Sequence, residues 1–163
     1  MELDYRTIFK EFNKIRIDYL VVGGLAVNLH GVPRMTYDID LVISLESENI
    51  LRLVNKLAEW GYRPKFPVDP KDLTDPEKRN AWIREKGMKA MNFYSDTSPI
   101  GEIDLLFDLP IPFEGLKQRA VSFELEEDRI PTVSIHDLIE LKIQAGRKQD
   151  LADVEHLKII LER

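Results

Sequence analysis

The sequence predicts an α/β fold in which a mixed β-sheet is flanked by helices. Short β-rich runs alternate along the chain with segments in which apolar residues recur at helical spacing. The chain has 163 residues, of which 44% are hydrophobic, enough for one core and too few for two. We therefore expect a single domain over residues 1–163, with a core of about residues 1–133 and a C-terminal helical segment of about residues 134–163.

The first 61 residues predict an alternation of helices and strands. Apolar residues at helical spacing precede a short β-rich run that ends at a glycine pair, and Gly31 and Gly61 are placed where helices end. The expected elements are a helix from Tyr5 to Ile15, a strand from Tyr19 to Val22, a brief helix from Leu25 to His30, a strand from Tyr37 to Ser44, and a helix capped by Ser44 or Ser47.

The remainder predicts a loop, a meander and terminal helices. A loop with three prolines spans Pro64–Leu73, and Asp75-Pro76 opens a helix to about Lys86. Consecutive strands are expected at Ala90–Tyr94 and Ile103–Phe107, and further strands around Val121–Leu125 and Arg129–Val133. Ser134 is expected to open one helix and Asp150 the last one, whose apolar face would be Leu151, Val154, Leu157 and Leu161.

Composition excludes several classes of site. The chain has no cysteine, so neither a disulfide framework nor a thiolate zinc site can form, and we expect a reducing, cytoplasmic setting. No apolar stretch approaches the roughly 20 residues of a membrane span, so no membrane partner is expected. The net charge of -6 disfavours sequence-blind binding to a polyanion.

Two carboxylates stand two residues apart in the second expected strand. Asp38 and Asp40 would project from one face, because side chains alternate along a strand, while Ile39 and Leu41 point the other way. Paired acids must be solvated or bring in a cation, and their oxygen atoms suit Mg²⁺ or Mn²⁺. An edge strand with solvent-facing acids is the other interpretation of this D-x-D pattern.

Gly23-Gly24 stands between the first strand and the brief helix, upstream of the acid pair. Glycines allow backbone N–H groups to come close to phosphate oxygens, although a tight turn alone would also account for them. Neither a dinucleotide-binding G-x-G-x-x-G nor a P-loop is present. Asp104 lies in the middle of a later strand among apolar residues, where an unpaired acid is costly, so it is the expected third acid.

The glycine pair, the D-x-D pattern and the later aspartate together resemble the polymerase-β-type nucleotidyltransferase superfamily. Residues Tyr19 to Asp40, including Arg34 and Thr36, look most like small prokaryotic nucleotidyltransferases related to abortive-infection toxins. Residues Pro64 to Gly87 match no pattern of that family and are a candidate region for substrate recognition.

The resemblance implies specific roles. Asp38, Asp40 and Asp104 would be catalytic and hold Mg²⁺ or Mn²⁺, and Gly23 and Gly24 would hold the nucleoside triphosphate, ATP included. Arg34 and Lys142 are further nucleotide-binding candidates, although Arg34 fits an ordinary surface loop and Lys142 fits a helix C-terminus, which favours cations without any ligand. Asp150 and Asp153 are interpreted as helix caps.

The expected activity is therefore transfer of a nucleoside monophosphate to an acceptor hydroxyl by a two-metal, three-carboxylate mechanism. The acceptor, which the sequence does not identify, would be tRNA, a protein or a small molecule, and resemblance alone suggests a toxin with an antitoxin partner. Two alternatives stay open: a non-catalytic nucleotide-binding or regulatory module of the same fold, and a D-x-D glycosyltransferase.

Overall fold

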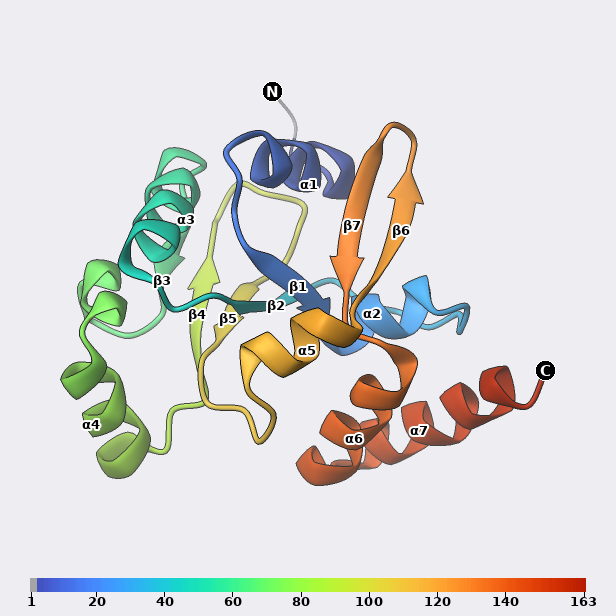
Figure 1. The fold of residues 1–163 in the computed structure, drawn as a ribbon. Coiled ribbons are helices and arrows are strands. Elements are labelled where there is room, and N and C mark those ends of the chain that lie inside the picture. Colours follow the sequence, from blue (N-terminus) through green and yellow to red (C-terminus); the bar gives the residue numbers. More distant parts are fainter. Residues whose placement is uncertain (1–2) are drawn as a thin grey trace.

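Seven strands form one mixed sheet at the centre of the molecule (Figure 1). The computed structural model describes residues 3–163; residues 1 and 2 of the predicted domain lie outside the described part. The strand order is β3-β4-β5-β2-β1-β7-β6, in which β2 and β5, and β1 and β7, are parallel and the other neighbours antiparallel. The strands are β1 (Tyr19–Val22), β2 (Ile39–Ile43), β3 (Arg63–Pro64), β4 (Ala90–Tyr94), β5 (Ile103–Leu106), β6 (Val121–Leu125) and β7 (Asp128–Thr132). The predicted mixed sheet flanked by helices is confirmed.

Helices cover the sheet, with α1 and α3 above the central strands in Figure 1 and α5, α6 and α7 below them. No helix among residues 3–163 has the length and apolar content that crossing a membrane requires. The helices are α1 (Tyr5–Lys14), α2 (Gly23–Leu29), α3 (Ser47–Glu59), α4 (Pro76–Lys86), α5 (Phe113–Arg119), α6 (Ile135–Ala145) and α7 (Lys148–Leu161), with a 3₁₀ turn η1 (Pro70–Thr74).

An aromatic cluster anchors α1 to the sheet. The ring of Phe12, which is fully buried, lies 5.5 Å from that of Tyr19 on β1, 6.3 Å from that of Phe9 and 5.7 Å from that of Trp60, measured between ring centroids. Tyr19 also donates a hydrogen bond to Asn13, so its hydroxyl is satisfied at the edge of the core. The cluster fixes β1, the strand that leads into the glycine pair.

Several predicted helix ends are confirmed by their hydrogen bonds. The carboxylate of Asp75 accepts the N–H of Glu77 at the start of α4, and Ser134 accepts that of Asp137 at the start of α6. Gly61 follows α3 with a φ of 83°, the left-handed conformation in which glycine avoids the clash of a Cβ. Local sequence chemistry therefore decides these boundaries.

Other predicted boundaries are wrong. The strand expected from Tyr37 begins only at Ile39, so Asp38 lies in the loop before β2, and α2 begins at Gly23 rather than Leu25. Neither Ser44 nor Ser47 caps α3, because Glu46 is its N-terminal flanking residue and makes no side-chain cap. The expected loop after Pro64 contains η1, which is opened by the Asp69 side chain.

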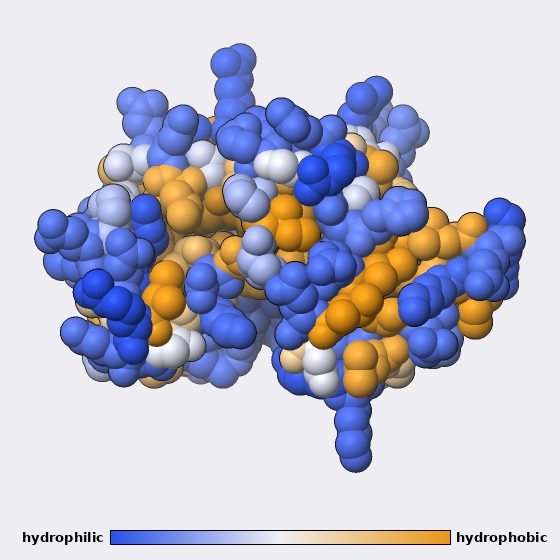
Figure 2. All heavy atoms as spheres, turned by 60° about the horizontal axis from the view of Figure 1, so that its bottom comes forward, coloured by the Kyte–Doolittle hydropathy of each residue, from blue (hydrophilic) through white to orange (hydrophobic). Residues whose placement is uncertain are grey.

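The expected apolar face of the last helix is also wrong in part. The helix begins at Lys148, so Asp150 is its third residue, where it accepts the backbone N–H of Arg147 in a capping box, whereas Asp153 lies inside the helix and is no cap. The buried residues are Asp150, Asp153, Val154 and Leu157, so Val154 and Leu157 confirm half of the predicted face. Leu151 and Leu161 are 49% and 40% exposed. Figure 2 shows apolar side chains at the surface on the side where α6 and α7 lie. Buried ion pairs, described below, take the place that the sequence pattern assigned to leucine.

Replacement of Phe12 by alanine is expected to cost about 3–5 kcal/mol of unfolding free energy, because it leaves a cavity among three rings. Leu151→Ala is the control, because its half-exposed side chain should cost under about 1 kcal/mol. Urea denaturation followed by circular dichroism measures both values. Equal losses would contradict this assignment of the core.

Candidate active site

Asp40 and Asp104 lie side by side on neighbouring strands. The parallel pairing of β2 with β5 sets Asp40 opposite Asp104, and the antiparallel pairing of β4 with β5 sets Asn92 opposite Asp104. Residues directly opposite one another in a sheet project from the same face. The structure thus forms a row of three polar side chains across three strands, which we call the polar row: Asp40, Asp104 and Asn92.

The two carboxyl groups of the polar row hold protons more tightly than free aspartates. Burial raises the pKa of Asp104 to about 8, against a hydrogen bond from Asn92 that lowers it, and the nearby charge of Asp40 adds to the rise. Burial also raises the pKa of Asp40, while the hydrogen bond with Asp104 and the charges of Lys142 and Arg147 oppose the rise. Neighbouring carboxyl groups that resist joint ionisation suit a divalent cation, so the donor set fits Mg²⁺ or Mn²⁺.

Asp38 lies near this pair, in the loop before β2. Its carboxylate is exposed and accepts the backbone N–H of Glu102, with 2.7 Å between oxygen and nitrogen. The charge of Asp38 still raises the pKa of Asp40. Within residues 3–163, no three histidine or acidic side chains are arranged to hold a metal ion. The structure therefore sets two of the three expected acids side by side and places the third nearby.

Gly23 makes room for the Asp40 carboxylate. A Cβ at this position would overlap the Asp40 oxygen Oδ2 and would lie 2.8 Å from Cγ, and Gly23 has a φ of 69°. Val22, the preceding residue, pairs with Asp40 across β1 and β2. The glycine turn and the first acid of the polar row therefore occupy one small region, as the sequence pattern predicts.

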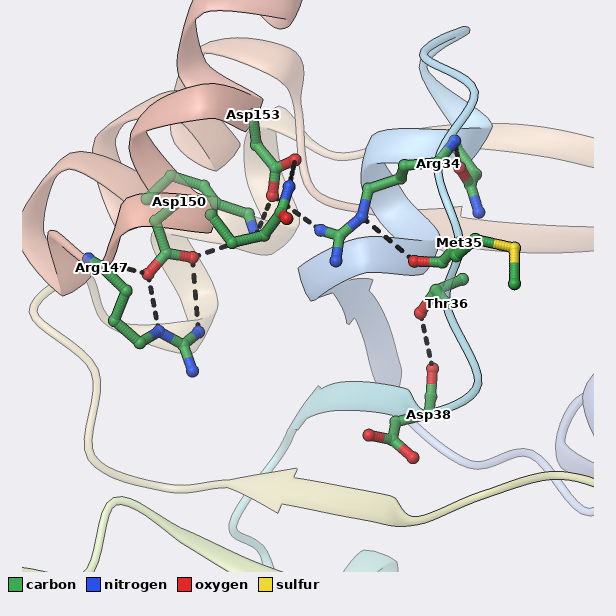
Figure 3. A network of polar contacts seen from close by, with 10 residues as sticks. Arg34, Met35, Thr36, Asp38, Arg147, Asp150 and Asp153 are labelled. Carbon is green, nitrogen blue, oxygen red and sulfur yellow. Dashed lines mark hydrogen bonds and ion pairs between the residues drawn. The ribbon is translucent and has the colours of Figure 1, made fainter.

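An ion-pair network closes the other side of the site (Figure 3). Lys142 on α6 is bound by Asp150 at 3.2 Å and by Asp153 at 2.9 Å, and all three residues are buried. Arg34 pairs with Asp153 at 2.7 Å, and Arg147 with Asp150 at 2.7 Å. Burial alone would raise the pKa of Asp150, but hydrogen bonding to Arg147 and the charge of Lys142 lower it overall. Three cations face two carboxylates, so the network keeps one excess positive charge.

The ion-pair network occupies Arg34 and Lys142, the two cations that the sequence predicts to bind nucleotide. The ammonium of Lys142 is enclosed by two carboxylates, and Arg34 spans from the loop before β2 to α7, packing over Gly24. Arg147, by contrast, has a side chain that is 79% exposed. The sequence favours Lys142 among the cations near the end of α6 because of the family resemblance, and it predicts Asp150 and Asp153 as helix caps rather than as the partners of Lys142 that they are.

A cleft of about 640 Å³ lies between the sheet and the C-terminal helices. Gly23, Asp40 and Arg147 line it, together with apolar side chains such as Leu106 and Leu138. Charged and apolar side chains in one cleft suit a ligand that carries both charged groups and a flat ring. Asn92 is a residue of the site that the sequence does not identify. Its only signal is that it is a polar residue in the middle of an expected strand.

Comparison with known proteins agrees with this geometry. A family model described as "Nucleotidyl transferase AbiEii toxin, Type IV TA system" matches residues 11–158. The chain belongs to this family. No curated protein sequence matches it significantly. By family and fold the protein is a nucleotidyltransferase, which confirms the resemblance seen in the sequence.

Solved structures share the fold of this AbiEii-family chain at low identity. The lincosamide antibiotic adenylyltransferase LnuA, solved with lincomycin, has 18% identity and a TM-score of 0.64, over 98% of this chain and 99% of that one. A putative nucleotidyltransferase from Thermotoga maritima has 15% identity and a TM-score of 0.55, over 99% and 98%. ANT(2")-Ia, solved with adenylyl-2"-tobramycin, has 12% identity and a TM-score of 0.56, over 95% and 91%.

Gly23→Ala is expected to destabilise the protein more than Gly87→Ala. Both glycines have a φ between 60° and 70°, but a Cβ at Gly87 meets no atom within 4 Å, whereas one at Gly23 displaces Asp40. The conformational strain of about 1 kcal/mol is common to both, and the clash adds about 1–3 kcal/mol at Gly23. Chemical denaturation measures the difference, and equal losses would show that Asp40 does not fill that space.

Stability without added metal is expected to fall as pH rises from 5 to 8, and less so in Asp104→Asn. In the folded protein the Asp104 carboxyl has a pKa of about 8 and keeps its proton up to that pH, whereas in the unfolded chain it ionises near the ordinary aspartate pKa of 3.8. Its contribution to stability is thus complete below pH 4 and lost as pH passes 8. Because the group is partly exposed, solvent screening reduces the effect to about 1–2 kcal/mol. Denaturation in chelator at both pH values tests this, and parallel losses in the two proteins would refute it.

Proposed function

We propose that the protein transfers a nucleoside monophosphate from a nucleoside triphosphate to an acceptor hydroxyl in a Mg²⁺- or Mn²⁺-dependent reaction. The adjacency of Asp40 and Asp104 beside the Gly23 turn is the observation that supports it. The family and the shared fold support nucleotidyl transfer as the chemistry. In this reaction the acceptor oxygen forms a bond to the α-phosphorus, pyrophosphate leaves, and the hydroxyl proton passes to a base.

Asp40 and Asp104 would hold the divalent ions, and Asp38 would join them. To do so, Asp38 would have to give up the hydrogen bond from the Glu102 N–H, which is a small loss for an exposed group. Bound divalent ions supply charge neutralisation at the phosphates and activation of the acceptor oxygen. Asp104, the third acid of the expected set, would orient or deprotonate the acceptor hydroxyl.

The triphosphate would lie along the Gly23-Gly24 backbone and the positive side of the cleft. Arg147 is the cation best placed to contact it, because its side chain is exposed and interacts electrostatically with Asp40. Lys142 would attract the phosphates through the net positive charge of the ion-pair network rather than by contact. Arg34 would hold the loop that carries Asp38. The apolar side chains that line the cleft, such as Leu106 and Leu138, would contact the nucleobase.

For the acceptor we propose only broad chemical classes. Structures of the same fold include one bound to an antibiotic and one bound to an adenylylated antibiotic, so a small hydroxylated molecule is one class. The family description, which names toxins of toxin–antitoxin systems, supports a macromolecular acceptor such as tRNA or a protein, together with an antitoxin partner. The net charge of -6 favours a small molecule or a short nucleic-acid end over a long polyanion.

The remaining alternatives make different predictions. A non-catalytic module of this fold would bind triphosphates without releasing pyrophosphate. A D-x-D glycosyltransferase would hydrolyse sugar nucleotides, and both the family and the fold count against it.

Asp40→Asn and Asp104→Asn are each expected to reduce transfer at least about 100-fold, because each removes a charge that faces the metal and the phosphates. The assay uses four labelled nucleoside triphosphates with Mg²⁺ or Mn²⁺ and acceptors from the tRNA, protein and aminoglycoside classes, and measures labelled product and pyrophosphate. Asp96→Asn is the matched control, because this acid pairs with Arg63 on the surface and should leave activity unchanged. Full activity in either site variant would contradict the mechanism.

A further inference from the structure

Asn92 is the third member of the polar row, and none of the roles assigned so far uses it. We propose that Asn92 is a positioning residue: its side-chain amide orients the Asp104 carboxylate so that one oxygen stays free toward Asp40 and the divalent cation. The inference rests on the proposed function, because it concerns the same site.

The contact between Asn92 and Asp104 is direct. The Asn92 nitrogen Nδ2 donates to the Asp104 oxygen Oδ1 at 2.8 Å, within the range of a charge-assisted bond. The two residues face each other across the ladder of β4 and β5. Asp104 also lies directly opposite Asp40 on β2. The carboxylate thus lies between an amide on one strand and a carboxyl on the other.

The backbone around Asn92 is held firmly, so its amide is a fixed donor. Met91 and Phe93, on either side, are 1% exposed and point to the opposite face, into the core. The Asn92 carbonyl accepts the N–H of Lys65, which pairs β4 with the chain beyond β3 as well as with β5. A free carboxylate can rotate about its last bond, but one that is bound at Oδ1 presents Oδ2 in a single direction.

The identity of residue 92 also has no packing explanation. Asparagine is depleted in strands because it packs poorly on a pleated surface, and the Asn92 side chain is only half-buried. Its amide donates instead to the Asp104 carboxylate. Groups that orient ligating carboxylates in this way affect metal affinity by about 10-fold to 100-fold when they are removed.

Mn²⁺ binding to the full chain without nucleotide, followed by electron paramagnetic resonance, tests the inference independently of turnover. Asn92→Leu, similar in size but without a donor, is expected to weaken Mn²⁺ binding about tenfold or more. Asn92→Ala, which adds no bulk, should show the same loss if the leucine variant folds poorly. Tyr94→Leu is the matched control, on the same strand and face but in contact with Arg63, and should change Mn²⁺ binding less than twofold.

A double-mutant cycle separates orientation from general stability. In an Asp104→Asn background, loss of the Asn92 amide should weaken Mn²⁺ binding by less than about twofold, because the carboxylate that it orients is gone. An equal loss in both backgrounds would overturn the inference, and so would unchanged Mn²⁺ binding in Asn92→Leu and Asn92→Ala. If Asp104→Asn itself left Mn²⁺ binding unchanged, the proposed function would fail first, which distinguishes the two failures.

Discussion

The parallel pairing of β2 with β5 is the constraint on which the site depends. It sets Asp40 beside Asp104, and two carboxylates at this separation repel each other. What keeps them there is the apolar opposite face of both strands, since Ile39, Leu41, Ile103 and Leu105 are fully buried. Burial of these apolar side chains supplies the free energy that outweighs the repulsion between the two acids. Functional sites are commonly less stable than the scaffold that holds them.

A second constraint comes from the C-terminal helices. Buried charges are tolerated only when they are paired, and the network of Arg34, Lys142, Arg147, Asp150 and Asp153 meets this condition with three cations and two acids. Because Arg34 comes from the loop before β2, the network joins residues more than 100 positions apart in the sequence. It therefore holds α6 and α7, which line the cleft, against the loop that leads to Asp38.

The fold was largely predictable, because apolar periodicity, caps and turn glycines are local signals, as at Asp75, Ser134 and Gly61. Asp104 is predicted as part of the site because an unpaired acid in the middle of an apolar strand is costly, and the family resemblance supplies its role. Register is a non-local property, so the partner of Asp104 across β4, Asn92, could not be found from spacing. The last helix departs from its prediction for a similar reason. Leucines at helical spacing predict an apolar face, but ion pairs with Lys142 and Arg34, which are distant in the sequence, allow an aspartate of this helix to be buried.

The raised pKa values of the two acids in the polar row bear on the proposed metal site. A divalent ion that bound there would have to displace the proton that these acids hold. Occupancy of the site would therefore depend on acidity as well as on metal concentration, and binding of the ion would release protons into the medium.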